Sequence, residues 1–442
     1  MNDTHDPKRR SWVESANDPE CDFPIQNLPF GVFRRSGSDE PPRAGVAIGD
    51  WVLDITACLK KGMFDNKARV AAKACSAVLL NSLMALGKDY WSAIREQISE
   101  LLREDSSFSR ERRADIEGCL IPMSGIEPLL PVHIGDYTDF YASISHATNV
   151  ESMFRPQTPL PPNYKYIPVA YHGRASSIIL SGTPVQRPLG QWLHEKTDTP
   201  SFGPSERLDY EIEIGFYIGP GNALGEAVDI DMAEDHIFGF CIVNDWSARD
   251  IQAWEYQPLG PFLGKSFATT ISPWIVTLEA LEPFRTKPFN RPRSFPVLMP
   301  YLTSSVKNEL GGIHLTLEVY LSSQTMREEK CDPFLVSRGN LKDMYWTVAQ
   351  MLAHHTINGC NLRTGDLLAS GTVSGSEKDT MGCLLELTWG GKEPVKLPTG
   401  ERRRFLEDGD EVIMRAYCER SGKARIGFGE CRGMVLPADS TE

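Results

Sequence analysis

The chain has 442 residues, of which 41% are hydrophobic and 24% are charged, a composition typical of a globular protein with more than one domain. Its formal net charge of −13 argues against nucleic acid or an anionic membrane as the main partner. The 10 cysteines show no C-x-x-C pair, so the sequence indicates a reduced, cytoplasmic protein. No apolar run reaches the ~20 residues that a membrane-spanning helix needs.

The first 130 residues contain no catalytic pattern. Residues 1–22 are polar and lack the apolar centre of a signal peptide, so we predict a flexible tail. Short strand-like runs follow, and then helical periodicity over residues 67–86 and 89–103. Three prolines make Pro122–Pro131 a candidate linker. We therefore predict a small β-rich module with helices at residues 23–130.

Residues 131–442 differ in character from the first part. Strand-like runs alternate with Gly and Pro turns, and polar and aromatic residues cluster between them. A few helical segments are expected, notably at residues 247–256 and 340–354. The pattern predicts a large, mainly β domain that carries the chemistry.

The first polar cluster of this domain is D-Y-T-D-F-Y-A-S-I-S-H, which ends at His146. If the segment is helical beyond Asp139, the Asp139 carboxylate and the His146 imidazole lie seven positions apart on one helical face. A metal ligand beside a general base is one interpretation, because an imidazole titrates near neutral pH. A helix-entry aspartate and a surface histidine are the alternative.

The second cluster is the run L-D-Y-E-I-E-I-G-F-Y-I-G at Leu208–Gly219. On a strand, Asp209, Glu211 and Glu213 project from one face. The other face carries Tyr210, Ile212, Ile214 and Phe216. Neighbouring carboxylates repel each other unless water or a cation intervenes, and hard oxygen ligands suit Mg²⁺ or Ca²⁺. A solvated strand face is the alternative.

The third cluster is V-N-D-W-S-A-R-D-I-Q-A-W-E-Y at residues 243–256. We expect a helix here, capped by one of three polar residues: Asn244, Asp245 or Ser247. Arg249, Gln252 and Tyr256 then form one polar stripe. Such a set suits binding of a carboxylate or stabilisation of an enolate oxygen. A surface stripe is the alternative.

Two later segments complete the candidates. Around Lys265 the glycine spacing is one residue short of a phosphate loop, so a phosphate-binding role is disfavoured. The functional interpretation that we favour places Lys265 near an anionic centre and Thr269 near a cation. Gly371–Ser376 reads as an exposed turn that binds an anion through backbone N–H groups. Glu386 lies in a predicted strand at Cys383–Leu387.

Together these segments resemble the fumarylacetoacetate hydrolase family. The resemblance rests on D-F-P-I-Q-N-L-P at 22–29, Y-T-D-F-Y, H-A-T-N-V, Y-H-G-R-A-S-S at 171–177, L-D-Y-E-I-E, N-D-W-S-A-R-D-I-Q-A-W-E-Y, P-L-G-P-F-L-G-K-S-F, N-G-C-N-L-R at 358–363 and G-D-L-L-A-S-G-T. It covers nearly the whole chain except the tail and about residues 278–342. It implies a mainly β fold with α (α+β), in which a small SH3-like N-terminal barrel precedes a large C-terminal mixed β-roll.

The resemblance also implies roles for individual residues. The metal environment for Ca²⁺ or Mg²⁺ would consist of Asp139, Glu211, Glu213, Asp245, Lys265 and Thr269. His146, steadied by Glu386, would be the base that activates water. The oxyanion and the leaving enolate would be stabilised by Arg249, Gln252 and Lys265. The substrate would be held by Tyr141, Arg155, Tyr171, Gln252, Tyr256 and Thr372.

The implied activity is metal-dependent hydrolysis of the C–C bond of a dicarboxylate diketo acid, 4-fumarylacetoacetate, as the last step of tyrosine and phenylalanine breakdown. A cytoplasmic homodimer is also implied. Acylpyruvate hydrolysis or oxaloacetate decarboxylation on the same metal site is the alternative. A binding or scaffold protein is disfavoured, because every candidate ligand and the base are present. One departure is Ala268, where the family commonly has glycine.

Overall fold

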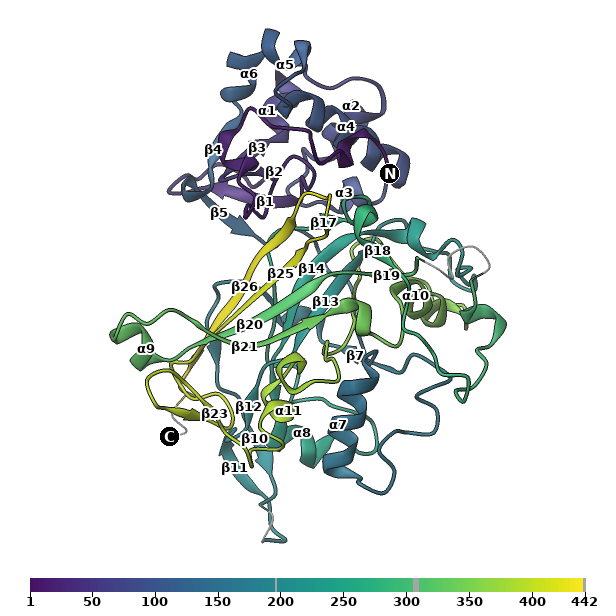
Figure 1. Cartoon of the computed structure of the whole chain (residues 1–442), viewed down its shortest axis with the longest axis vertical. Coiled ribbons are helices and arrows are strands. Elements are labelled where there is room, and N and C mark those ends of the chain that lie inside the picture. Colours follow the sequence, from purple (N-terminus) through teal and green to yellow (C-terminus); the bar gives the residue numbers. More distant parts are fainter. Residues whose placement is uncertain (195–196, 305–309, 440–442) are drawn as a thin grey trace.

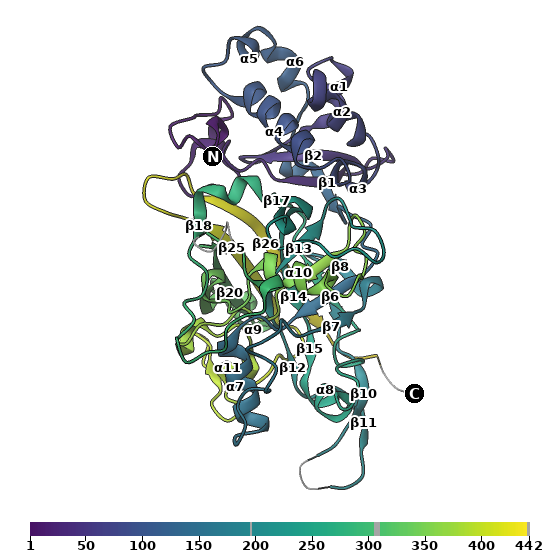
Figure 2. The same ribbon diagram turned by 90° about the vertical axis from the view of Figure 1, so that its right-hand side faces the viewer.

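The computed structural model describes residues 1–194, 197–304 and 310–439. The N-terminal part of the chain, purple to blue in Figure 1, lies at one end of a larger C-terminal part, and Figure 2 shows the same arrangement from the side. Helices combine with mixed β-sheets, which confirms the predicted α+β class. Across the described ranges, no helix has both the length and the apolar character that crossing a membrane requires.

The N-terminal part is built on a five-stranded antiparallel sheet in the order β4-β3-β2-β1-β5. Its strands are β1 (Phe30–Arg35), β2 (Arg43–Ile48), β3 (Trp51–Asp54), β4 (Leu120–Pro122) and β5 (Ile126–Leu129). The accompanying helices are α1 (Ile55–Lys60), α2 (Asn66–Ala74), α3 (Asn81–Met84), α4 (Lys88–Leu102), α5 (Ser107–Glu111) and α6 (Arg113–Glu117). The linker predicted at Pro122–Pro131 is wrong, because β4 ends at Pro122 and β5 occupies Ile126–Leu129.

The flexible tail predicted for residues 1–22 is also wrong. Thr4 and His5 are 2% and 5% exposed. The Asn2 side chain donates a hydrogen bond to Glu279 Oε1 over 2.7 Å, and the indole N–H of Trp12 donates to Leu101 O over 2.9 Å. The first residues therefore pack against both α4 and the C-terminal part.

The C-terminal part contains an eight-stranded mixed sheet in the order β7-β6-β22-β13-β14-β16-β8, with β17 beside β14. The strands are β6 (Tyr137–Phe140), β7 (Ala170–Gly173), β8 (Ile178–Leu180), β13 (Ile212–Ile218), β14 (Ile237–Asp245), β16 (Thr269–Ile271), β17 (Val276–Thr277) and β22 (Leu367–Ala369). The β6–β22 and β8–β16 pairs are parallel and the others antiparallel.

A second, five-stranded sheet has the order β21-β20-β25-β26-β9. It consists of β9 (Val185–Gln186), β20 (Thr316–Ser322), β21 (Phe334–Asn340), β25 (Glu411–Cys418) and β26 (Ile426–Leu436). Two-stranded ladders pair β10 (Leu189–Trp192) with β11 (Ser201–Pro204), β12 (Leu208–Asp209) with β15 (Ser247–Ala248), β18 (Arg285–Thr286) with β19 (Gly312–Ile313), and β23 (Val395–Lys396) with β24 (Arg402–Arg403). The helices are α7 (Ile144–Phe154), α8 (Arg249–Glu255), α9 (Gln324–Glu328), α10 (Val348–Thr356) and α11 (Leu384–Leu387).

Both faces of the large sheet are covered by apolar layers. Ile214 and Phe216 of β13 point into the core shared with the second sheet, whereas Tyr217 points into the core shared with the N-terminal part. The predicted apolar face of this strand is therefore correct. The alternative interpretation, in which the opposite face is solvated, is wrong because Glu211 and Glu213 are 5% and 0% exposed. Asp209 on the same face is 0% exposed, so the sequence buries three carboxylates inside the protein.

Candidate active site

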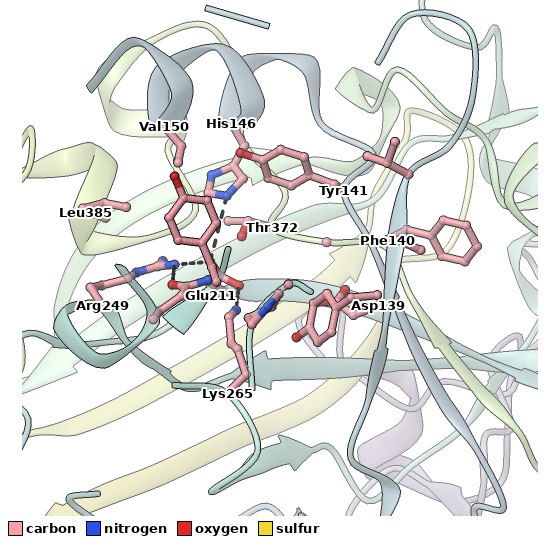
Figure 3. A pocket seen from close by; sticks show the side chains of 18 of the residues that line it. Asp139, Phe140, Tyr141, His146, Val150, Glu211, Arg249, Lys265, Thr372 and Leu385 are labelled. Carbon is pink, nitrogen blue, oxygen red and sulfur yellow. Dashed lines mark hydrogen bonds and ion pairs between the residues drawn. The ribbon is translucent and has the colours of Figure 1, made fainter. Parts of the chain in front are cut away.

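A cavity of about 370 Å³ opens in the C-terminal part, between the large sheet and helices α7 and α8 (Figure 3). These helices lie away from the N-terminal part in both overall views. The predicted site residues that line the cavity are Asp139, Tyr141, His146, Tyr171, Glu211, Glu213, Arg249, Gln252, Tyr256, Lys265 and Thr372. Asp245 and Thr269 line an adjacent cavity of about 170 Å³, which shares Tyr171 and Lys265 with the first.

Four buried carboxylates meet beside this cavity. One oxygen of each of Asp139, Glu211, Glu213 and Asp245 lies within 4.8 Å of the others. The sheet brings them together, because β6, β22, β13 and β14 are consecutive neighbours. The backbone N–H of Asp245 also donates a hydrogen bond to Glu211 O over 3.1 Å. Asp209 does not join this cluster, in contrast to the three-carboxylate face that the strand pattern predicted.

Two cations partly compensate this charge. Lys265 Nζ contacts Glu211 and lies 2.7 Å from Asp245 Oδ2, and Arg249 Nη1 lies 2.7 Å from Glu211 Oε1. Figure 3 shows Glu211 between the two side chains. Burial acts to raise the pKa of Glu211, but the charges of Arg249 and Lys265 outweigh it and lower that pKa. Burial and the neighbouring carboxylates instead raise the pKa values of Asp139 and Glu213.

The cluster fits a divalent cation. Among the described residues, nothing hydrogen-bonds Asp139 Oδ1 or Glu213 Oε1, although both atoms are buried. Leaving a buried polar group unsatisfied costs about 1–3 kcal/mol, and more for a charged group. Carboxylate oxygens at this density are the ligands that Ca²⁺ and Mg²⁺ prefer. The unpartnered atoms and the donor chemistry therefore agree with a hard metal ion at this position.

We expect the affinity for Mg²⁺ or Ca²⁺ to rise with pH. The raised pKa values of Asp139 and Glu213 mean that the metal-free site holds protons above pH ~4.5, where these groups ionise in an unfolded chain. Metal binding must release those protons. The protonated Asp139 and Glu213 contribute stability to the metal-free protein. That contribution is fully present below the pKa values of the unfolded chain and is lost as pH rises through the raised pKa values of the folded protein. Calorimetric titrations in buffers of different ionisation enthalpy would detect the proton release, and a pH-independent affinity would contradict it.

The candidate base is part of a buried pair. His146 Nδ1 lies 2.6 Å from Glu386 Oε2, so the imidazole donates to the carboxylate and its Nε2 faces the cavity side, 3.9 Å from Glu211 Oε1. Asn149 and Ser374 also donate to Glu386, over 2.8 and 2.7 Å. Burial acts to raise the pKa of Glu386, but His146 and these hydrogen bonds outweigh it and lower that pKa.

The secondary-structure elements that carry Asp139, His146 and Glu386 differ from the predicted ones. Asp139 lies in β6 and His146 in α7, so they approach the cavity from separate elements rather than from one helical face. Glu386 lies in the short helix α11, not in the strand predicted at Cys383–Leu387. An alternation over five residues was too short to distinguish a strand from one helical turn.

Helix α8 presents the predicted polar stripe to the cavity. Arg249 Nη1 donates to Gln252 Oε1 over 3.2 Å, and Tyr256, at the end of the helix, receives a hydrogen bond on its hydroxyl from Arg155 Nη2 over 3.2 Å. The predicted capping residues are wrong, because the N-cap is Ala248 and no side chain caps the helix. The surface-stripe alternative is also wrong for Arg249, which is 7% exposed.

The remaining candidates surround the carboxylates. The Tyr171 hydroxyl donates to Asp245 Oδ2 over 2.8 Å, and the Tyr141 ring meets the His146 ring edge-on at a centroid distance of 5.3 Å. Thr372 lines the cavity, and no described residue hydrogen-bonds its buried hydroxyl.

Gly371–Ser376 is not the exposed turn that we predicted, because residues 371–375 are buried. Ala268 is buried and does not need a positive φ.

Sequence reasoning missed Asn149 and Ser374 as supports of the site, and it grouped Asp209 with Glu211 and Glu213 instead of with Arg249. Asn149 and Ser374 hold Glu386, and Asp209 contacts Arg249. Asn149 lies three positions after His146, so helical spacing could have placed the two on one face. No local signal connects Ser374 to Glu386 or Asp209 to Arg249, because these contacts depend on the tertiary fold.

Comparison with known proteins identifies the family of this chain. Family models described as "Fumarylacetoacetase N-terminal" and "Fumarylacetoacetate (FAA) hydrolase C-terminal" match residues 26–131 and 136–436. Proteins named fumarylacetoacetase are similar over nearly their whole length. The protein from Oryza sativa is 50% identical, and the matched region covers 97% of this chain and 97% of that protein. The protein from Dictyostelium discoideum is 48% identical, and the matched region covers 98% of this chain and 99% of that protein. The human one is 46% identical and covers 97% and 99%. The chain belongs to the fumarylacetoacetase family.

Proposed function

We propose that the protein is an enzyme that hydrolyses the C–C bond of 4-fumarylacetoacetate to fumarate and acetoacetate, in tyrosine and phenylalanine catabolism. The observation that carries the proposal is one cavity that joins a buried carboxylate cluster to a His–Glu pair. Membership of the family, with relatives named fumarylacetoacetase at 46–50% identity, supports the same reaction.

Water is the nucleophile in the proposed mechanism. His146 Nε2 removes a proton from water as the water oxygen attacks the carbonyl carbon of the fumaryl group, while Glu386 holds the imidazole and stabilises its positive form. The C–C bond then breaks, fumarate forms, and the electron pair leaves as the enolate of acetoacetate. The imidazolium returns its proton to the carbanion carbon, so the base is regenerated.

Charge develops on oxygen in both steps. We assign its stabilisation to Arg249, Gln252 and Lys265, which line the cavity next to Glu211. A divalent cation held by Asp139, Glu211, Glu213 and Asp245, with Lys265 and Thr269 close by, would supply Lewis-acid stabilisation of the same oxygens. Ca²⁺ and Mg²⁺ both suit this ligand set.

The dicarboxylate substrate needs further polar contacts. We assign them to Tyr141, Arg155, Tyr171, Gln252, Tyr256 and Thr372. The Arg155–Tyr256 pair offers a guanidinium and a phenol for one carboxylate. The unpartnered Thr372 hydroxyl offers a donor inside the cavity.

We also propose that residues 23–130 and 131–442 are the two domains, and that the protein works as a cytoplasmic homodimer on this small-molecule substrate without nucleic acid or membrane. The adjacent family matches at residues 26–131 and 136–436 support the boundary. The dimer agrees with the general prevalence of two-fold symmetry among oligomers.

We expect metal-stripped protein to be inactive and Mg²⁺ or Ca²⁺ to restore it. The experiment incubates chelator-treated protein with fumarylacetoacetate and follows the loss of diketone absorbance, with fumarate and acetoacetate identified as products. Parallel assays with a short acylpyruvate and with oxaloacetate test the alternatives. Faster turnover of either, or no turnover of fumarylacetoacetate with any metal, would refute the proposal.

A further inference from the structure

Asp209 lies behind the candidate site and is 0% exposed. It ends β12, whose partner β15 leads directly into α8. Its Oδ2 accepts a hydrogen bond from Arg249 Nε over 2.9 Å, and Arg249 Nη2 lies 2.9 Å from the same atom. The third guanidinium nitrogen, Nη1, reaches Glu211 Oε1 over 2.7 Å. Asp209 and Glu211 therefore hold opposite sides of one guanidinium.

The same carboxylate also contacts helix α11. The backbone N–H groups of Leu384 and Leu385 donate to Asp209 Oδ1 and Oδ2 over 2.8 and 2.9 Å. The residue before this helix, Cys383, gives it no side-chain cap. The first N–H groups of a helix have no partner within the helix, so a carboxylate from elsewhere in the fold here fills the role of a cap.

The two contacts connect the two halves of the proposed chemistry. Arg249 belongs to the group that stabilises the oxyanion, and Glu386, which follows Leu385, orients the base His146. These groups come from α8 and α11, which are far apart in the sequence. A carboxylate that binds both fixes their relative position, and positioning errors near 1 Å are enough to slow a reaction severely.

We propose that Asp209 is a positioning residue, which aligns the Arg249 guanidinium and the Glu386–His146 pair on one reaction centre. The inference rests on the proposed function. It extends that function to a residue that does not line the cavity and does not belong to the carboxylate cluster.

The test compares Asp209→Asn with Asp250→Asn. An asparagine keeps the shape but leaves one acceptor oxygen, so either the Leu384 contact is lost, or the Arg249 and Leu385 contacts are lost together. We expect kcat to fall about 100-fold, in the range seen for loss of an oxyanion-stabilising contact, with KM little changed. Asp250 is the matched control. It is a 9% exposed carboxylate bonded to Ser205 Oγ and Glu206 N, both over 2.6 Å, and its variant should keep kcat.

A second measurement separates positioning from general support of the fold. In a variant that already carries Arg249→Lys and Glu386→Gln, Asp209→Asn should reduce the residual turnover by less than about threefold, because residues that act as a unit are not additive. An equal loss in both backgrounds would overturn the inference. So would wild-type kcat in a folded Asp209→Asn or Asp209→Ser variant, or failure of both variants to fold. Inactivity of wild-type protein in the same assay would instead refute the proposed function.

Discussion

Replacement of His146 by alanine is expected to remove nearly all turnover while metal binding persists. The imidazole is 3% exposed, donates to Glu386 over 2.6 Å and directs Nε2 toward the carboxylate cluster. General-base catalysis contributes roughly 10²–10⁴-fold to a rate, so the loss should be at least about 100-fold. Steady-state assays on fumarylacetoacetate measure the loss, and calorimetric titration with Mg²⁺ measures the metal site.

His236→Ala is the matched control for this variant. His236 is a half-buried histidine that bonds Pro220 O over 2.7 Å and does not line the cavity. Its variant should keep wild-type turnover. Turnover of His146→Ala within about tenfold of wild type would contradict the assignment of the base, and loss of Mg²⁺ binding would show that the histidine belongs to the metal site instead.

Glu213→Gln should abolish the metal response without destabilising the metal-free protein. Glu213 is fully buried, and nothing among the described residues hydrogen-bonds its Oε1. Burial and the charges of Asp139 and Asp245 raise its pKa, so its ionised form is unfavourable when no metal is bound. A neutral amide removes that penalty but is a poorer ligand. We expect at least a 100-fold drop in Mg²⁺ affinity and in turnover, and an equal or higher Tm for the metal-free variant.

Thermal unfolding with and without Mg²⁺ gives both readouts. Glu318→Gln serves as the comparison, because Glu318 is a 5% exposed glutamate of β20 that bonds Arg338 over 2.7 Å, away from the cavity. That variant should keep the metal-induced rise in Tm. A Glu213→Gln protein that is still stabilised by Mg²⁺ as strongly as wild type would remove Glu213 from the ligand set.

Local periodicity could predict part of this site. The alternation at Leu208–Gly219 predicted an apolar face toward a core and three carboxylates on the opposite side; Glu211 and Glu213 do meet in the carboxylate cluster, whereas Asp209 contacts Arg249 instead. Helical spacing also predicted that Arg249 and Gln252 would share a face. Both patterns depend only on the geometry of one element, which a single sequence contains.

The rest of the site depends on tertiary contacts that no local pattern encodes. Glu386 meets a histidine 240 positions earlier, and its own segment is a single helical turn rather than a strand. Asp139 joins the cluster through the parallel pairing of β6 with β22. The role proposed for Glu386 follows from the family resemblance and not from spacing, whereas the roles proposed for Asp139 and His146 were one interpretation of a helical spacing that the structure does not show.

The order of synthesis adds a consequence to these long-range contacts. A ribosome releases the N-terminal part first, yet Asn27 donates a hydrogen bond to Gly427 O in β26, 400 positions later. The same last strand pairs with β25 and β9 to complete the second sheet. A nascent chain can therefore expose the base and all four carboxylates long before the core behind them closes. Catalytic competence should arise only near the end of translation, and chains cut short within the final strands should be inactive and prone to aggregation.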